Sequence, residues 1–479
     1  MRHHEHDVDF ERRATRLLRA AANDLKRDEN SADHDLGLEP GSFAAYVSGR
    51  IPVTWNLIQR AARVWPLNER DLLPVRDDCP DGVRIHRLKE SVATSRVLAR
   101  DGADYYEYRD TAMSRGASYR PEWIRMLQVV DDDDPDNPLV KWNRGHLLYQ
   151  FTYFIGPVNY YYSWDGERVC IPMDTGDSVW GLPFAPHTFT AREASQPAYI
   201  LALTYGGDLV GDAQREASLL GAETARELAL STIDPRRAKA QLLGSYFTAR
   251  AMTVPEAADR TGLPAARLTA LLAGTAEPAL GELRRLASAL GLSVRDLLPP
   301  RSTTERGVVV RRAVDTRRWL HPDPAAPSYR LRELATDPLH PHTSSFEVEV
   351  LDTGGRPGAP LATTQHQYAY VLGDAPVTLT WTSDGGEYQE ELAPGDSVYV
   401  RPQISVAFTA VSAADSAPGR ARPGTERPRV LLLRIGGAIS PDVRFALGSM
   451  AESGISRYIA EDRLWYAKGR ENSDNNTSR

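Results

Sequence analysis

The sequence predicts an α+β protein, mainly β, in which a helical module followed by a small closed β-barrel occurs twice. Three observations predict this fold: an internal repeat, helical spacing of apolar residues early in each copy, and alternating strand patterns in the remainder. Three segments occur twice in one order: RDLLP (70–74, 295–299), GDSV (176–179, 395–398) and FTA (189–191, 408–410). The offsets are 225, 219 and 219 residues, so a tandem duplication is indicated.

The helical module is clearest in RTGLPAARLTALLAGTAEPALGELRRLASALGLSVRDLLPP (260–300). Its apolar residues recur at helical spacing, and breaks are predicted at Gly262, Gly274 and Gly291. This is the layout of a helix-turn-helix module. The segment 36–75 follows the same plan, so we expect such modules at residues 1–78 and 235–300.

The second part of each copy reads as strands. Residues 146–192 and 366–411 alternate β-branched and aromatic residues, with turns at Gly-Pro, Asp-Gly and Thr-Gly-Asp sequences. Short strands with frequent turns favour a small closed barrel. We expect barrels at 79–234 and 301–440, followed by a tail (441–479) that is helical at first and disordered over ENSDNNTSR.

Bulk composition excludes several classes of protein. The chain has 479 residues, 42% hydrophobic and 25% charged, with a net charge of −7 that disfavours a general nucleic-acid binder. Two cysteines, Cys79 and Cys170, provide no disulfide framework. The sequence has no membrane-length apolar run and its first residues are not a secretory signal. We expect a cytoplasmic protein.

The segment NRGHLLYQ (143–150) carries the most informative motif. His146 is followed four residues later by Gln150, and after a Thr-Gly-Asp turn by His187. This pattern resembles the cupin barrel, the double-stranded β-helix, in which the three residues would lie on neighbouring strands. Two imidazoles plus a third ligand leave open positions, the arrangement of mononuclear non-haem Fe(II) enzymes. The usual carboxylate is missing, because Gln150 and Gly181 stand where it is expected; Asp177 or a water could occupy the space at Gly181. The alternative is a degenerate barrel without metal.

The second copy does not repeat this motif. At the offset of 219 residues His187 corresponds to Val406, and His366 can be set against His146, which puts Tyr370 opposite Gln150. One histidine does not hold iron, so we expect a metal-free second barrel and one active site per chain.

Upstream of the first barrel, RVLARDGADYYEYRD (96–110) holds Arg100 and Tyr108 eight residues apart, and Asn143 precedes His146 by three. An Arg, a Tyr hydroxyl and an Asn amide beside a metal would bind an anion, since all three donate hydrogen bonds. Together with the helical modules, these motifs resemble the Fe(II)-dependent oxygenases of phosphonate biosynthesis: hydroxypropylphosphonate epoxidase, 2-hydroxyethylphosphonate dioxygenase and methylphosphonate synthase.

The resemblance implies a role for each motif residue. His146 and His187 match the iron histidines, and Arg100, Tyr108 and Asn143 match residues that hold the phosphonate. A lysine of the N-terminal module also reaches substrate in this family, and Lys26 is the best candidate. Glutamine in the position of Gln150 matches the synthase. The epoxidase uses glutamate four residues after its first histidine, and the dioxygenase uses glutamate six residues before its second histidine, which is the position of Gly181 here.

The sequence therefore predicts a cofactor-independent Fe(II) oxygenase that uses O2 to cleave the C–C bond of 2-hydroxyethylphosphonate, giving methylphosphonate and CO2 or bicarbonate. One alternative is the dioxygenase reaction, which gives hydroxymethylphosphonate and formate. Another is a transcriptional regulator with a cupin sensor, although DNA binding is disfavoured because SFAAYVSGR (42–50) offers few donors besides Arg50. Homo-oligomer formation is left open.

Overall fold

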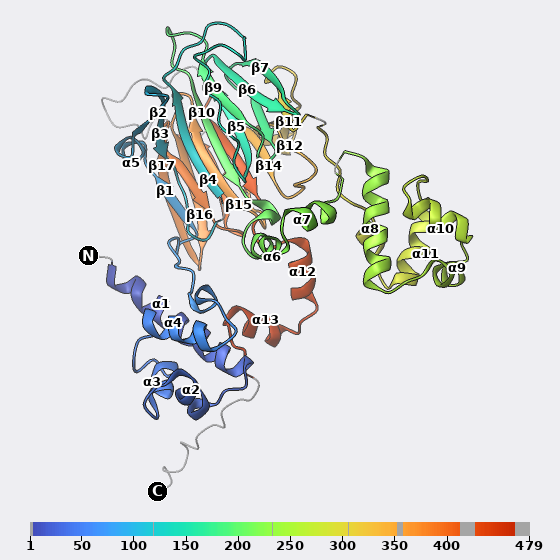
Figure 1. Cartoon of the computed structure of the whole chain (residues 1–479). Helices are drawn as coiled ribbons and strands as arrows, with labels where there is room; N and C mark the ends of the chain where they lie inside the picture. The colour runs from blue at the N-terminus through green and yellow to red at the C-terminus, as the bar shows by residue number, and fades with distance from the viewer. Residues whose placement is uncertain are drawn as a thin grey trace. The chain divides into compact units, whose positions relative to one another are not determined.

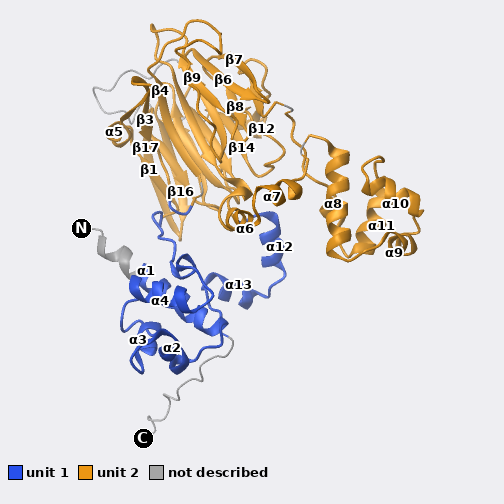
Figure 2. Cartoon of the chain, in the orientation of Figure 1, with its two compact units in different colours: residues 1–80, 114–116, 439–479 blue, residues 81–113, 117–438 orange. Residues whose placement is uncertain are grey.

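The computed structural model describes residues 3–117, 119–231, 233–304, 306–351, 358–411 and 427–464, with side chains from residue 10 onward. The chain forms two compact units, one of residues 1–80, 114–116 and 439–479, the other of residues 81–113 and 117–438 (Figure 2). Helices and antiparallel sheets both contribute substantially (Figure 1). None of the helices in these described ranges has the length and apolarity needed to cross a membrane.

The first unit is helical. Its elements are α1 (His3–Asp24), α2 (Glu29–Leu36), α3 (Ser42–Val47), α4 (Trp55–Val64), η1 (Glu69–Leu72), α12 (Pro441–Gly448) and α13 (Glu452–Ile459). Asp28 caps α2 by accepting from the Ser31 amide, and Gly37 ends it in the left-handed conformation. The helices α12 and α13 lie in the predicted tail, whereas ENSDNNTSR lies outside the described residues.

A second set of helices forms its own apolar core. It consists of α8 (Pro235–Ala249), α9 (Val254–Thr261), α10 (Ala265–Leu272), α11 (Leu280–Leu290) and η3 (Val294–Leu297). Fully buried Leu268 and Leu286 lie in this core. Left-handed glycines end α9 at Gly262 and α11 at Gly291, as the sequence predicts.

Each copy contributes one large and one small sheet. The first seven-stranded sheet has the order β11-β8-β5-β10-β4-β3-β2 and is matched by the three-stranded sheet β7-β6-β9. Their bounds are β2 (Arg96–Arg100), β3 (Ala103–Asp110), β4 (Tyr119–Met126), β5 (Tyr149–Ile155), β6 (Val158–Trp164), β7 (Glu167–Met173), β8 (Ser178–Gly181), β9 (His187–Ala191), β10 (Tyr199–Tyr205) and β11 (Val308–Arg311). One apolar cluster draws residues from both sheets, so the core lies between them.

The second pair of sheets repeats this plan. Its orders are β1-β18-β15-β20-β14-β13-β12 and β17-β16-β19. Their bounds are β1 (Val83–His86), β12 (Arg318–Asp323), β13 (Ala326–Glu333), β14 (Ser344–Val350), β15 (His366–Leu372), β16 (Val377–Ser383), β17 (Gly386–Leu392), β18 (Ser397–Val400), β19 (Ser405–Ala410) and β20 (Arg429–Ile435). Shorter helices α5 (Leu88–Ala93), η2 (Gly207–Leu209), α6 (Asp212–Leu220) and α7 (Ala222–Leu228) connect strands or follow them.

The two copies exchange edge strands. Strand β1 belongs to the first copy but pairs with β18 of the second, and β11 belongs to the second copy but pairs with β8 of the first. The predicted ranges 79–234 and 301–440 therefore do not form two separate sets of sheets. Each large sheet needs a strand from the other copy to be complete.

Two buried aspartates fix the exchanged strands. Asp177 accepts from Arg312 Nη1 at 2.7 Å and from the Ala313 amide at 2.8 Å, immediately after β11. Asp396 accepts from Arg87 Nη1 at 3.0 Å and from the Leu88 amide at 2.7 Å, immediately after β1. These reciprocal contacts give a structural role to the repeated GDSV segment. The alternative that placed Asp177 near the metal is wrong, because its carboxylate is engaged by Arg312.

Asp177→Asn should destabilise the fold by about 2 kcal/mol, because it removes a mostly buried ion pair and weakens the bond to the Ala313 amide. Differential scanning calorimetry would measure the shift in the unfolding transition. Asp136→Asn is the matched control, since Asp136 pairs with Arg168 but its side chain is 69% exposed. Equal stability of the two variants would contradict a stabilising role for the contacts of Asp177 with Arg312 and Ala313.

Candidate metal centre

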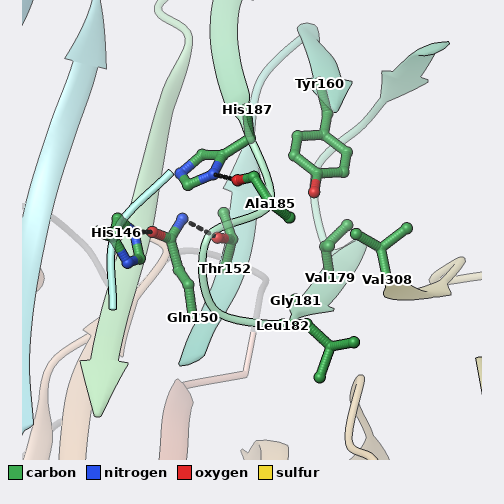
Figure 3. A pocket seen from close by; sticks show the side chains of 10 residues that line it. All are labelled: His146, Gln150, Thr152, Tyr160, Val179, Gly181, Leu182, Ala185, His187 and Val308. Carbon is green, nitrogen blue, oxygen red and sulfur yellow. Dashed lines mark hydrogen bonds between the residues drawn. The ribbon is translucent and has the colours of Figure 1, made fainter. Parts of the chain in front are cut away.

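His146, Gln150 and His187 line one pocket of the first pair of sheets (Figure 3). His146 lies just before β5, Gln150 is the second residue of β5, and His187 begins β9. Because β5 and β9 belong to the large and the small sheet, the pocket opens between the two sheets. Its complete lining is His146, Gln150, Thr152, Tyr160, Val179, Gly181, Leu182, Ala185, His187 and Val308.

Asn143 ties the two histidine segments together. Its Oδ1 accepts from the His187 amide at 2.8 Å and from the Gly145 amide at 2.9 Å. Gly145 has a φ of 72°, and a Cβ there would collide with the backbone of Phe184. The loop before β5 therefore requires glycine, and Asn143 fixes the loop against the start of β9.

Both histidines are oriented through their Nδ1 atoms. His146 Nδ1 lies 3.0 Å from the Leu148 carbonyl oxygen, and His187 Nδ1 lies 2.9 Å from the Ala185 carbonyl oxygen. A carbonyl only accepts, so each Nδ1 carries the proton. In the neutral ring the Nε2 lone pair is then free, which is how carbonyl contacts prepare histidine for a metal.

The donor atoms converge in a way that fits a cation. Gln150 Nε2 donates to Thr152 Oγ1 at 2.9 Å, which turns Gln150 Oε1 toward His146 Nε2 at 3.0 Å. With His146 neutral, both facing atoms are acceptors and repel each other unless a cation lies beside them. The imidazole rings of His146 and His187 are nearly perpendicular, with centroids 5.1 Å apart.

Burial keeps His187 in the form that binds metal. Loss of solvent, helped by the charges of His146 and Arg100, lowers the pKa of His187 to about 4, although the hydrogen bond to the Ala185 carbonyl opposes the shift. His187 is therefore neutral near pH 7. Among the described residues no cluster of three or more His, Cys, Asp or Glu side chains is arranged for a metal. A metal at this pocket would thus rely on the Gln150 amide as its third protein ligand.

The second copy gives a direct comparison. In the strand ladders Gln150 pairs with Gly181, and Gln367 pairs with Val400 in the equivalent strands, so Gln367 corresponds to Gln150. The expectation that Tyr370 stands opposite Gln150 is wrong. The offset between the two copies at β5 and β15 is two residues shorter than the 219 residues that separate the repeated GDSV and FTA segments. Gln367 is fully buried, donates to the Leu361 carbonyl and accepts from Arg434.

Val406 stands where His187 is expected, within a wholly apolar cluster. His366 Nδ1 contacts the Tyr399 hydroxyl at 2.9 Å. In the described part of the second copy, the amide of Gln367 and the imidazole of His366 therefore bond to other protein groups, and the two side chains form no convergent donor set.

Arg100 and Tyr108 lie on β2 and β3, which β10 and β4 separate from β5 in the large sheet. Arg100, at the end of β2, donates to the Lys141 carbonyl at 2.5 Å and to Thr188 Oγ1 at 3.1 Å, next to His187. Tyr108 on β3 is mostly buried, and loss of solvent together with the Glu122 charge raises the pKa of Tyr108 to about 12. Its hydroxyl is therefore a neutral hydrogen-bond donor at pH 7.

Lys26 belongs to a different compact unit from the other candidate residues. It belongs to the first unit, where its Nζ donates to the Asp24 carbonyl at 2.9 Å, while the other six residues belong to the second. The sequence reasoning missed Thr152, which orients Gln150, and Val308, which lines the pocket. Thr152 could have been found from the two-residue period of β5. Val308 could not, because strand exchange brings it to the pocket.

Comparison with known proteins identifies relatives of this chain. No protein-family model matches the chain. It is 37% identical over 446 residues to methylphosphonate synthase of Nitrosopumilus maritimus, covering 93% of both chains. It is 28% identical to 2-hydroxyethylphosphonate dioxygenase of Streptomyces viridochromogenes, over 67% of this chain and 72% of that one.

Among solved structures, that of Streptomyces albus HEPD (2-hydroxyethylphosphonate dioxygenase), with 2-hydroxyethylphosphonate and Fe(II) bound, superposes on this chain with a TM-score of 0.90. That protein is 57% identical, and the match covers 96% of this chain and all of the other. The fold and these relatives define an iron-dependent oxygenase. The chain belongs to the iron-dependent phosphonate oxygenase family that includes methylphosphonate synthase and 2-hydroxyethylphosphonate dioxygenase.

Replacing His146 or His187 with alanine should weaken Fe(II) binding by more than about 100-fold, since each removes a ligand. Iron per chain after anaerobic loading and desalting measures this loss. His366→Ala is the matched control in the second copy and should retain one iron per chain. Iron retained by the His187 variant, or lost from the His366 variant, would place the metal elsewhere.

Proposed function

We propose that this protein is an Fe(II)-dependent oxygenase that cleaves the C–C bond of 2-hydroxyethylphosphonate with O2. The observation that carries the proposal is the convergence of His146 Nε2 and Gln150 Oε1 next to His187, all in one pocket. His146, Gln150 and His187 would hold the iron. When bound, the iron supplies the redox centre for O2.

The other candidate residues bind and orient the substrate. Arg100 supplies a positive charge to the phosphonate, and Tyr108 supplies a hydroxyl donor that stays protonated because burial raises its pKa. Asn143 uses its Oδ1 to fix the histidine segments, which leaves its Nδ2 as a donor. Lys26 is proposed as a further cation. Fixing the substrate in this way contributes several kcal/mol to catalysis, roughly as in other positioned reactions.

The products we propose are methylphosphonate and bicarbonate. The substrate plus O2 contains the atoms of methylphosphonate, bicarbonate and one proton. All four electrons therefore come from the substrate, and no 2-oxoglutarate is needed. Gln150 in place of a carboxylate and the 37% identity to methylphosphonate synthase over 93% of both chains support this product.

A second candidate is hydroxymethylphosphonate with formate. The observation that favours it is the higher identity, 57%, to the Streptomyces albus protein named HEPD. The same atoms balance this reaction, because hydroxymethylphosphonate plus formic acid also equals substrate plus O2. The two candidates share the substrate, the metal site and the C–C cleavage, and differ in whether the one-carbon phosphonate receives hydrogen or hydroxyl.

We also propose a cytoplasmic enzyme whose helical modules do not read DNA. Cys79 and Cys170 are both free thiols. Helix α10, the second helix of the turn in the second module, exposes Ala265, Ala266 and Thr269, which offer few donors to phosphates or bases.

Turnover should be followed by phosphorus and carbon NMR after anaerobic Fe(II) loading, with carbon-labelled 2-hydroxyethylphosphonate and then O2. We expect methylphosphonate and labelled bicarbonate. Hydroxymethylphosphonate with formate would establish the second candidate. A protein that holds iron yet leaves the substrate intact would refute the proposed substrate.

Gln150→Glu should retain iron and change the ratio of the two products, because it adds a negative charge to the ligand set. Gln150→Leu is the control that removes the oxygen without adding charge, and it should lose iron. Iron content and product NMR together report both effects. Unchanged iron and products in both variants would show that Gln150 is not a ligand.

A further inference from the structure

Gly181 leaves a notch in the pocket wall beside Gln150. It is the last residue of β8, and the strand ladders place it between Gln150 on β5 and Val308 on β11. Val308 comes from the second copy through strand exchange. The notch is therefore bounded by a ligand residue on one side and by a residue of the other repeat on the opposite side.

Neither backbone conformation nor crowding requires glycine at this position. Gly181 does not lie in the left-handed region, and an added Cβ would meet only Val308 Cγ1, at an ordinary contact distance of 3.8 Å. The notch thus has room for at least a methyl group. Glycine inside a strand weakens it and often marks the close approach of a ligand. The missing side chain keeps a space open next to the candidate metal ligands.

The walls of the notch are apolar apart from one hydroxyl. Val308, Val179 and Leu182 line the pocket next to Gly181 (Figure 3). Tyr160, only 4% exposed, points its hydroxyl into the same pocket, and that hydroxyl has no hydrogen-bond partner among the residues the structure describes. Burial raises the pKa of Tyr160, so the hydroxyl remains a donor. The open space therefore has one neutral hydrogen-bond donor on an otherwise apolar wall.

We propose that the Gly181 notch is the subsite that receives dioxygen. This rests on the proposed function. The phosphonate needs charged and polar partners, which Arg100, Tyr108 and Asn143 offer, whereas the notch has apolar walls and one neutral donor. Dioxygen is small and apolar, and it fits a methyl-sized space next to Gln150. The second repeat then contributes directly to the site, through Val308.

Xenon tests the notch independently of turnover, because xenon occupies small apolar cavities. Crystals of the wild-type protein pressurised with xenon should show a xenon atom beside Gly181, and crystals of Gly181→Ala should not. The oxygen dependence of turnover forms the second arm. Gly181→Ala and Val308→Ile should raise the KM for O2 by at least about threefold, because each fills the notch.

Val310→Ile is the matched control. Val310 lies on the same strand, two residues from Val308, and is not part of the pocket lining, so the KM for O2 of this variant should stay at the wild-type value. The dissociation constant of 2-hydroxyethylphosphonate, measured by calorimetry without O2, should be unchanged in all three variants.

Two results would overturn the proposal. One is the absence of xenon beside Gly181 in the wild-type protein. The other is weaker binding of 2-hydroxyethylphosphonate by Gly181→Ala with an unchanged KM for O2, which would assign the notch to the substrate. Failure of the wild-type protein to turn over this phosphonate would instead refute the proposed function, and xenon at Gly181 would still support a gas-accessible notch.

Discussion

The reciprocal exchange of β1 and β11 is the constraint on which the β structure depends. Each exchanged strand completes the large sheet of the other copy and is held by a buried aspartate of a GDSV segment. Strands β8 and β18 are thereby paired on both sides, and the exchanged strands β11 and β1 form the edges. The sheets of both copies lie in one compact unit, and the exchange places Val308 in the wall of the pocket that holds the candidate ligands.

The candidate metal site consists of hydrogen-bond acceptors that line one pocket. Backbone carbonyls accept hydrogen bonds from Nδ1 of His146 and His187, and Thr152 Oγ1 accepts one from Nε2 of Gln150. The Nε2 atom of His146 and the Oε1 atom of Gln150 then face each other in the pocket next to His187, an arrangement that a bound cation would satisfy. The surrounding hydrogen bonds therefore prepare the site, as carbonyl and hydroxyl partners do for metal ligands in general.

The two copies share a backbone plan but use it differently. Gln150 and Gln367 occupy equivalent ladder positions, yet Gln367 is satisfied by Leu361 and Arg434, and Val406 fills the place of the second histidine. The second copy has thus gained a continuous apolar core where the first keeps a pocket. The second copy also supplies strand β11 to the first copy and, through Val308, part of the pocket wall.

Local sequence determined the repeat, the helices that end at Gly262 and Gly291, and the motif of His146, Gln150 and His187, because these depend on spacing along the chain. The sequence predicted the family correctly. It paired Tyr370 with Gln150 wrongly, because a change of offset inside a repeat cannot be located from neighbouring residues alone. Only the tertiary structure decided that Asp177 forms an ion pair with Arg312 and that Val308 pairs with Gly181 on the neighbouring strand. These contacts join residues more than a hundred positions apart through strand exchange, and strand exchange is fixed by the packing of whole sheets.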